Sequence, residues 1–273
     1  MWTATSRVQH SRAGLRFSSD LTDAEWAVLQ PLVPPRSPVG RRPSWPLREI
    51  VNAIFYVLRG GVPWRMLPPC FPPRQTVYGW FAAWRDTGVW QTINHHLVML
   101  DRERCGREAS PTAAVVDSQS VKTTEAGGPR GFDAGKKIKG RKRHIVTDTA
   151  GHLVGLLIHI ASIQDRDGAV TVLASIRRLY PWLRHVFADG GYAGQKLRHA
   201  LLAFGRWTMQ IIKRSDTAQG FEILPRRWVV ERTFAWLGRC RRLTKDFEKN
   251  MTSSTAWTLI ANVRRLTRTL ARV

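Results

Sequence analysis

Acidic residues are scarce in this chain of 273 residues. Asp and Glu number 20 against 43 Lys and Arg, which gives a formal net charge of +23 at pH 7. A folded protein with a sequence pI near 11.4 is expected to bind a polyanion. Nucleic acid is the first expectation and an anionic membrane surface is the alternative.

Cysteines and long apolar runs are scarce as well. The three cysteines, Cys70, Cys105 and Cys240, lie far apart and form no CxxC pair, which argues against a disulfide framework and suits a reducing compartment. No run approaches the roughly 18 apolar residues of a membrane span, and the first residues lack the apolar core of an export signal. We therefore expect a cytoplasmic protein with no membrane partner.

The remaining composition is that of a folded protein. Hydrophobic residues make up 43% of the chain and include 12 Trp residues, which excludes a wholly disordered chain. The length suits one large domain or two ordinary ones. We expect a flexible basic arm over residues 1–17, a helical domain over residues 18–105 and an α/β domain over residues 106–273.

Helical signals dominate the first half of the chain. Thr22 is followed three residues later by Glu25, which is the pattern of a capping box at a helix start. Residues 47–59 are apolar almost all round, which indicates a buried helix. Further helices are expected at about residues 75–86 and 89–104.

Two of these helices flank a proline-rich connector, an arrangement that resembles a helix-turn-helix unit. In such a unit the N-terminal residues of the second helix read DNA, which makes Arg74, Gln75 and Thr76 recognition candidates. A plain helical bundle explains the same pattern equally well.

Short strands replace helical periodicity after residue 106. One apolar strand ends in Asp117, a hairpin turns at Ala150–Gly151, and another short strand ends in Asp189. Helices are expected over RDGAVTVLASIRRLY, GQKLRHALLAF and about residues 252–270, with a further strand over RWTMQIIKR. Strands interleaved with helices predict an α/β fold with a mixed sheet.

A further helix is predicted from Pro225 to Phe247. It combines apolar and cationic side chains with a single carboxylate near its middle, Glu231. Helical spacing places Arg227 one turn before Glu231. An ordinary Arg–Glu pair on a solvated helix explains this spacing, and so does a metal-binding carboxylate beside a polyanion.

Three carboxylates are candidates for one site. Asp117 and Asp189 end strands, and strand ends are where ligands gather in α/β sheets. With Glu231 alongside, the three would repel one another unless a divalent cation such as Mg²⁺ were bound. Asp117 as a strand-end cap and Asp189 as a turn residue are the simpler alternatives. Asp165 and Asp167 are interpreted as helix-capping acids outside the site.

Residues 125–144 form a glycine-rich, cationic segment. Its glycines disfavour a stable helix and its like charges repel. We expect it to be flexible in the free protein and ordered over a DNA backbone near Asp117. The alternative is that Arg141–His144 begins the next strand and only the glycines are mobile.

Several motifs together resemble those of DDE transposases of bacterial insertion sequences, close to the insertion sequence five family. The matching stretches are SSDLTDAEWAVLQPLVPP, VDSQSVKT, GRKRHIVTDTAGHL, QDRDGA, ADGGYAG and RRWVVERTFAWLGRCRRLTKDFE. The resemblance implies a ribonuclease-H-like catalytic domain preceded by a small all-helical, helix-turn-helix-like domain. Asp117, Asp189 and Glu231 match the family's catalytic Asp, Asp and Glu.

The family's signature around the third acid is matched in part. That signature is Tyr, two residues, Arg, three residues, Glu, six residues, Lys. Arg227 and Glu231 fit it, whereas Leu224 stands in the Tyr position and Gly238 in the Lys position. Arg239, one residue later, is a candidate for the missing cation.

The resemblance further implies an enzyme that binds the ends of an insertion sequence, cleaves them and joins them to target DNA. The three acids would hold two Mg²⁺ ions, for which Mn²⁺ can substitute. The phosphate-binding candidates are Lys122, Arg227 and Arg239, and the candidates for following the DNA backbone are Lys136, Lys137, Lys139, Arg141, Lys142 and Arg143.

Double-stranded DNA, as terminal repeats and target, is the expected partner. A homodimer or larger assembly on DNA and association with the nucleoid are expected too. The alternatives are a catalytically silent repressor that binds the same element and a ribonuclease-H-like nuclease without joining activity. A basic RNA-binding protein is a weaker alternative, because it leaves the acids unexplained.

Overall fold

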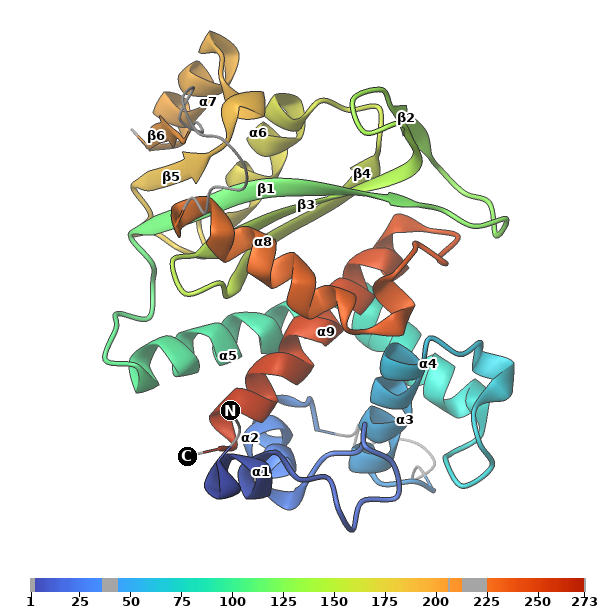
Figure 1. Cartoon of the computed structure of the whole chain (residues 1–273). Coiled ribbons are helices and arrows are strands. Elements are labelled where there is room, and N and C mark those ends of the chain that lie inside the picture. Colours follow the sequence, from blue (N-terminus) through green and yellow to red (C-terminus); the bar gives the residue numbers. More distant parts are fainter. Residues whose placement is uncertain (1–2, 36–43, 206, 213–224, 273) are drawn as a thin grey trace.

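The computed structural model describes residues 3–35, 44–205, 207–212 and 225–272, and centres on a sheet with helices on both faces (Figure 1). The helices are α1 (Ala4–His10), α2 (Asp23–Leu29), α3 (Leu47–Gly60), α4 (Arg74–Asp86), α5 (Val89–Arg104), α6 (Asp165–Ile176), α7 (Gln195–Gly205), α8 (Pro225–Gly238) and α9 (Met251–Leu270). Single 3₁₀ turns occur at Gln30–Leu32 (η1), Trp64–Met66 (η2), Gly190–Tyr192 (η3) and Arg241–Leu243 (η4). The strands are β1 (Ala113–Lys122), β2 (Gly131–Asp133), β3 (Ile138–Asp148), β4 (Leu153–Ile160), β5 (His185–Ala188) and β6 (Thr208–Ile211).

The sheet is mixed, as predicted. On one side of β1, β3 and then β4 run antiparallel to their neighbours, and β2 pairs with the start of β3. On the other side, β5 and then β6 run parallel to β1. Three antiparallel strands that continue into two parallel ones give the expected ribonuclease-H-like sheet.

The hairpin between β3 and β4 turns where it was predicted to turn. Asp148 fixes it, because its Oδ1 accepts from the backbone amides of Ala150 and His152, both at 2.9 Å. Gly151 has φ 88°, and a Cβ at this position would lie 2.9 Å from Thr233 Oγ1 of α8. Thr233 also donates to the carbonyl of Gly151 at 2.9 Å, so α8 is anchored on this turn.

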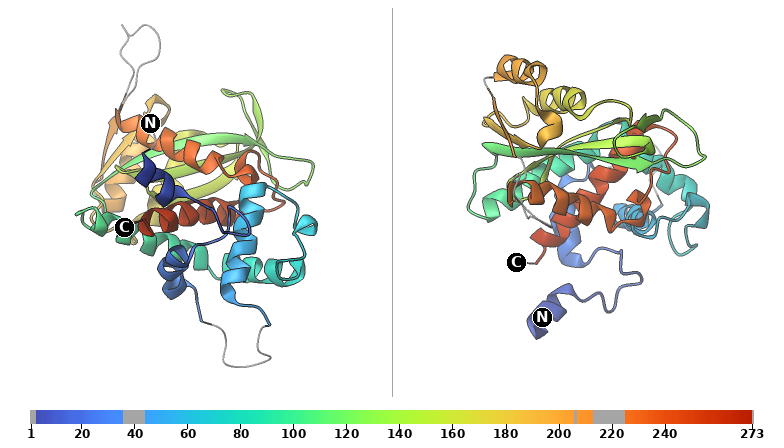
Figure 2. Two further views of the ribbon diagram at one scale, coloured as in Figure 1. Left: turned by 60° about the horizontal axis from the view of Figure 1, so that its bottom comes forward. Right: turned by 45° about the horizontal axis from the view of Figure 1, so that its top comes forward.

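Helices cover the sheet on both faces. Helices α6 and α7 lie on one face, and α5, α8 and α9 lie on the other (Figures 1 and 2). Among the described residues, no helix is long and apolar enough to cross a bilayer. The capping box at α2 is confirmed, since Thr22 and Glu25 bond each other's backbone amides at 3.1 Å.

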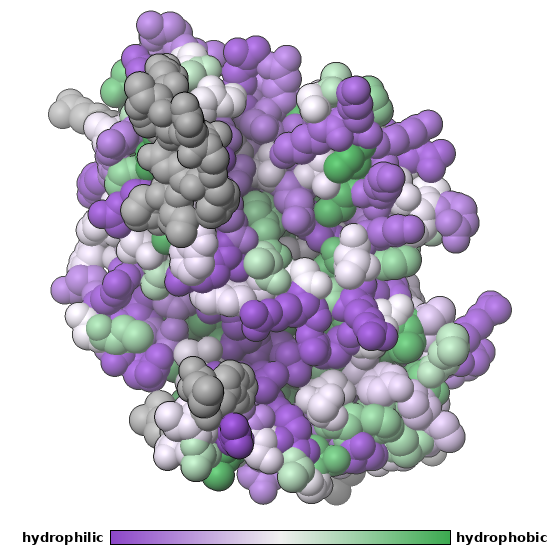
Figure 3. All heavy atoms as spheres, in the orientation of Figure 1, coloured by the Kyte–Doolittle hydropathy of each residue, from purple (hydrophilic) through white to green (hydrophobic). Residues whose placement is uncertain are grey.

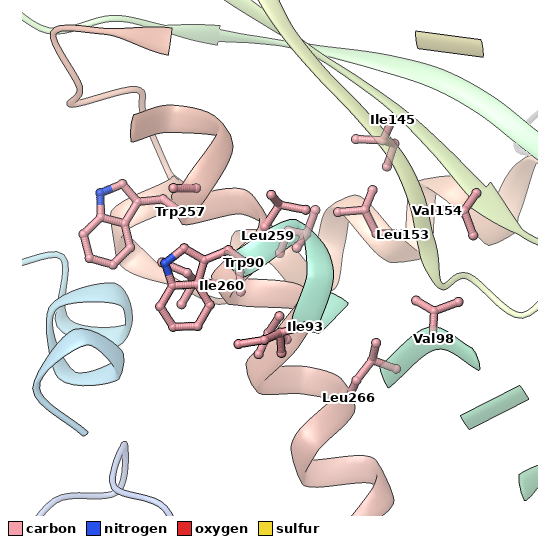
Figure 4. Packing of buried hydrophobic residues seen from close by; sticks show 14 of the residues in the cluster. Trp90, Ile93, Val98, Ile145, Leu153, Val154, Trp257, Leu259, Ile260 and Leu266 are labelled. Atoms are coloured by element: carbon pink, nitrogen blue, oxygen red, sulfur yellow. The ribbon is translucent and has the colours of Figure 1, made fainter. Parts of the chain in front are cut away.

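Helix α9 occupies the centre of the molecule. It contacts α2, α3, α4, α5 and the sheet at β4, so the apolar cluster continues from the helices into the sheet. Figure 4 shows its side chains, Trp257 and Ile260 among them, against α5 and the β3–β4 hairpin. Asn262 of α9 donates to Asn94 of α5 at 2.7 Å, and Asn94 donates to the carbonyl of Leu153 at 2.9 Å.

Three elements differ from the prediction. The strand of Asp117 continues to Lys122, because β3 pairs with it over this whole length. The helix from Pro225 ends at Gly238 rather than Phe247, and a 3₁₀ turn follows. The connector between α3 and α4 covers residues 61–73, which is longer than the three or four residues of a helix-turn-helix turn.

The N-terminal stretch contains local structure. Residues Ala4–His10 form α1, and Arg12 pairs with Glu25 at 2.5 Å. Arg16 pairs with Glu49 at 2.8 Å. These ion pairs hold the stretch against α2 and α3.

A buried ionic network joins α5 to the hairpin. His152 lies between two carboxylates, with Nε2 2.7 Å from Asp101 and Nδ1 2.9 Å from Asp148. Burial alone would raise the pKa of each carboxyl group, but the hydrogen bonds to His152, with those from Arg104 to Asp101 and from Arg102 to Asp148, outweigh it and both pKa values are lowered. Burial likewise opposes the charged imidazole, yet the two carboxylates raise the pKa of His152 above its ordinary 6.5.

This network predicts a pH-dependent contribution to stability. A raised folded-state pKa stabilises fully below the unfolded value of 6.5, and the contribution is lost as the pH rises through the folded value. We expect His152→Gln to lower the free energy of unfolding by about 3 kcal/mol near pH 6, because it removes the charged hydrogen-bond partner that two buried carboxylates share and leaves Asp148 with Arg102 and Asp101 with Arg104. Urea titrations should show this deficit shrinking as the pH rises above 6.5 and through the raised folded-state pKa.

The control is His96→Gln, at an exposed position on helix α5. It should leave the stability nearly unchanged at every pH. A His152→Gln deficit that is the same across this pH range would contradict a charged His152.

Candidate active site

The pairing of β1 with β5 brings two predicted acids together. Their last paired residues are Val115 and Phe187. Asp117 on β1 and Asp189 directly after the end of β5 each lie two residues beyond that pair, at the same level of the sheet. The two apolar runs that end in Asp117 and Asp189 thus place their carboxylates side by side, although β1 itself continues past Asp117.

Asp117 is half-buried and its carboxyl group is perturbed. Its Oδ1 accepts from the backbone amide of Ser118 at 2.7 Å. Burial, followed by the charge of Asp189, raises the pKa of Asp117 to about 6, against the lowering effects of the Ser118 amide, Lys136 and Arg227. This carboxyl group thus favours a nearby cation more strongly than an exposed aspartate does.

Asp189 begins the turn that follows β5. Its Oδ1 accepts from the amide of Gly191 at 2.8 Å and caps the 3₁₀ turn Gly190–Tyr192. Its side chain is 30% exposed. Asp189 is therefore a turn residue, as the simpler alternative proposed, and its second oxygen remains available to other groups.

Helix α8 supplies the third carboxylate. It packs against β1, β3 and β5 and carries Arg227 and Glu231 one turn apart. One Nη2 of Arg227 lies 3.6 Å from Asp189 Oδ2 and 3.6 Å from Glu231 Oε1. The Arg–Glu pair of the helix is therefore present, and the same guanidinium joins Glu231 to the acids of the sheet.

A family model described as "Transposase DDE domain" matches residues 108–264, more than half of the chain. The chain belongs to the DDE transposase family. Residues 21–94 match a second family model, described as "Putative transposase of IS4/5 family".

Two curated relatives come from Burkholderia cepacia. The "Putative transposase for insertion sequence element IS402" is 35% identical over 117 residues, which cover 40% of this chain and 54% of the relative. The "Insertion element IS402 uncharacterized 16.2 kDa protein" is 31% identical over 114 residues, or 39% of this chain and 76% of the relative. The match thus spans about half the length of the first relative, and no solved structure matches the chain significantly.

A DDE domain implies the use of a divalent metal, and the donors of this family member suit one. Carboxylate oxygens are the ligands that hard divalent cations prefer. Among the residues that the structure describes, no three His, Cys, Asp or Glu side chains are grouped closely enough to hold one ion. The guanidinium of Arg227 lies between Asp189 and Glu231 and supplies a positive charge there.

Lys136 is an exposed cation near Asp117. Its Nζ donates to the carbonyl of Ser118 at 3.1 Å, next to Asp117. Lys122, Lys137 and Lys139 are also exposed on β1 or on the segment before and within β3. Arg239 is exposed beyond the end of α8 and forms no ion pair with the three acids in the part of the chain described. Leu224 lies outside the described residues.

Three predicted DNA-binding side chains are instead internal, which corrects their assignment. Arg141, Lys142 and Arg143 are 0%, 4% and 2% exposed within β3. Lys142 pairs with Asp165 at 2.8 Å, and Arg143 donates to the carbonyls of Leu243 and Lys245. Arg141–His144 lies in the next strand, as the alternative expected, but that strand begins at Ile138 rather than at Arg141.

Arg141 shows why these cations are buried. It pairs with Asp246 at 3.2 Å and donates to the carbonyls of Pro129, Glu248 and Lys249, each at 2.8 Å. The segment after α8 thus closes over β3 through charged hydrogen bonds. Because most partners of Arg141 lie far away in the sequence, no local sequence pattern indicated that Arg141 is buried.

Asp165 is a carboxylate near the site that the sequence interpretation set aside. It lies in the first turn of α6, as a helix-capping acid does, but it also accepts from Ser118 Oγ at 2.7 Å. It therefore joins α6 to the residue next to Asp117. The sequence signal was its place in QDRDGA, within a stretch that resembles the family.

The buried Arg141–Asp246 pair predicts a stability effect. We expect Arg141→Gln to lower the free energy of unfolding by about 3–5 kcal/mol, because it leaves Asp246 buried without its cation. Thermal and urea unfolding would measure the loss. Lys139→Gln, exposed two residues earlier on β3, is the matched control and should change the stability by less than about 0.5 kcal/mol. Equal effects of the two substitutions would contradict the internal assignment of Arg141.

Proposed function

We propose that this protein is a transposase that binds the ends of an insertion sequence, cleaves them and joins them to target DNA. The observation that carries the proposal is the convergence of Asp117, Asp189 and Glu231 around Arg227, within the matched DDE domain. The substrate is double-stranded DNA, as terminal inverted repeats and as target. It would act on the bacterial nucleoid.

The three acids would hold two Mg²⁺ ions, with Mn²⁺ able to substitute. When bound, such ions activate a water molecule or a 3′-hydroxyl and stabilise the leaving oxygen of the phosphodiester. The half-buried position of Asp117 and the charge of Asp189 beside it disfavour two bare carboxylates. Both groups therefore favour a bound divalent cation.

Arg227 and Lys136 would contact the phosphates next to the reacting bond. Arg227 is 30% exposed, so its guanidinium can reach solvent and a substrate. An arginine fork suits phosphate oxygens, and binding them would also orient the scissile bond. Lys136 donates to the carbonyl of Ser118, the residue after Asp117, and adds a second positive charge near that acid.

The basic surface supplies the wider DNA contacts. Hydrophilic side chains dominate the middle of the face shown in Figure 3. Lys122, Lys137, Lys139 and Arg239 are exposed and would contact backbone phosphates, a sequence-independent and salt-sensitive contribution.

Recognition of the element ends would fall to residues 18–105. Arg74 and Gln75 are exposed at the start of α4 and Thr76 is half-buried, so these side chains can reach a groove. Two ends must be processed together, and a homodimer or larger assembly on DNA would hold both.

Loss of any one acid should abolish cleavage while DNA binding stays. Asp117→Asn, Asp189→Asn and Glu231→Gln each remove a metal-binding charge without changing the shape of the side chain. We expect end cleavage to fall by at least about 10³-fold in each variant. Cleavage and joining of labelled end DNA with Mg²⁺ or Mn²⁺, and duplex affinity with Ca²⁺, would measure the two activities.

Asp167→Asn is the matched control, since Asp167 is an exposed acid of α6 that pairs with Lys196. It should cleave like the wild type. A triad variant with normal cleavage would remove that residue from the site. A wild-type protein that binds end DNA but never cleaves it would favour a repressor, and one that cleaves without joining would favour a nuclease.

Lys137 and Lys139 should account for part of the salt dependence of DNA binding. If each contacts one phosphate, replacing both with Gln should reduce the slope of log K against log salt by roughly 0.9 per contact. Duplex affinity from low to moderate salt would measure the slope. The control is Lys196→Gln with Lys249→Gln, which removes the same charge from other exposed positions. The same slope in wild type and the first variant would exclude both lysines from the DNA contact.

A further inference from the structure

The turn that carries Asp189 has little support from the sheet. Pairing between β1 and β5 ends at Phe187, and pairing between β5 and β6 ends at Ala188. From Asp189 to Ala193 the backbone hydrogen bonds among the described residues are those of the 3₁₀ turn, with the amide of Tyr192 donating to the carbonyl of Asp189 at 3.1 Å. A further contact is needed to fix this carboxylate relative to Asp117.

Tyr192 provides that contact. Its side chain is 1% exposed, and its hydroxyl lies 2.9 Å from Nε2 of His144. The two rings also meet edge to face, with centroids 5.5 Å apart. In the β1–β3 register His144 stands opposite Ser118, the residue that follows Asp117. One hydrogen bond thus joins the turn of the second acid to the strand beside the first.

The direction of each hydrogen bond between Tyr192, His144 and His159 follows from the bond that His159 forms with Ile160. His159 Nδ1 lies 2.9 Å from the carbonyl of Ile160, which can only accept, so Nδ1 carries the proton. The unprotonated Nε2 of a neutral His159 then accepts from Nδ1 of His144, at 3.3 Å. His144 Nε2 is therefore an acceptor, and the Tyr192 hydroxyl donates to it.

Burial favours the neutral form of both rings. It lowers the pKa of His144 to about 3 and lowers that of His159 as well. The charged groups facing His144 are Asp165, which opposes this shift, and Lys142 and Lys136, which add to it. At neutral pH His144 is therefore uncharged, and its Nε2 remains a hydrogen-bond acceptor.

Helix α6 closes over the two histidines at Gly168. A Cβ at this position would lie 2.6 Å from His144 Nδ1 and 2.7 Å from His159 Nε2, so a side chain would displace one ring. The same helix carries Asp165, which accepts from Ser118 Oγ. Asp117, His144 and the turn of Asp189 are therefore held by one set of contacts.

We propose that Tyr192 and His144 are positioning residues that set the separation of Asp117 and Asp189 for metal binding. Neither needs to touch the substrate. Their hydrogen bond fixes the turn after β5, and the turn fixes the Asp189 carboxylate. The consequence for cleavage rests on the proposed function, whereas the anchoring itself does not.

Tyr192→Phe removes the hydroxyl, with its bond to His144 and its contact with the Ser118 side chain, and keeps the ring. In the free protein, amide hydrogen exchange at Gly191, Tyr192 and Ala193 should become roughly tenfold faster, because one buried hydrogen bond no longer restrains the turn. Tyr180→Phe is the matched control, since Tyr180 is an equally buried tyrosine, 1% exposed, away from Asp117, Asp189 and Glu231. Its exchange at these amides should equal that of the wild type. Equal exchange in Tyr192→Phe and wild type would overturn the anchoring.

The consequence for the site is measured with Mn²⁺. Tyr192→Phe should raise the Mn²⁺ concentration for half-maximal end cleavage roughly tenfold and leave duplex affinity unchanged. His144→Leu should behave in the same way, while His144→Gln keeps an acceptor and should recover most of the loss. A general loss of stability would lower the amount of active protein without shifting the Mn²⁺ midpoint.

The two hypotheses fail separately. An unshifted Mn²⁺ midpoint in Tyr192→Phe, with normal wild-type cleavage, would overturn the positioning of the acids. Absence of cleavage by the wild type would contradict the proposed function, and hydrogen exchange would still decide whether Tyr192 anchors the turn.

Discussion

Parallel pairing between β1 and β5 is the constraint on which the candidate site depends. A short ladder that ends at Val115 and Phe187 places Asp117 of β1 and Asp189, just beyond the end of β5, at one level. Helix α8 is then held over the same strands by the β3–β4 turn, through Thr233 and Gly151. This packing brings Glu231 and Arg227 to the two acids. A slip of one residue in β5 would direct its side chains to the other face and remove Asp189 from the site.

The large positive charge of the chain is divided between the interior and the surface. Arg141, Lys142 and Arg143 lie within the sheet, and Arg102 is buried beside Asp148. These cations meet the scarce carboxylates or backbone carbonyls, so they join segments distant in sequence. Only part of the formal charge therefore contributes to a field that reaches DNA.

The sequence predicted the mixed sheet, the hairpin turn and the neighbouring positions of Asp117 and Asp189, because each leaves a local pattern; the catalytic role of these acids and of Glu231 stays a prediction. Apolar runs ending in acids mark Asp117 and Asp189, and Glu231 stands alone among arginines. The burial of Arg141 was not predictable locally, since Asp246 and the carbonyls of residues 248 and 249 lie about a hundred positions away. The bond from Tyr192 to His144 was missed for the same reason, because neither residue signals its partner.

The position of Arg227 has a thermodynamic consequence. Its guanidinium now interacts with Asp189 and Glu231, and in the proposed complex it turns to a phosphate. Withdrawal of that charge would leave both carboxylates free to hold a divalent ion, and occupation of the site by an ion would disfavour the return of the guanidinium. DNA and metal would then each increase the affinity for the other by the same factor, as linkage requires. Under the proposed function, positive cooperativity of this kind would keep the metal-loaded state rare until a DNA end is in place.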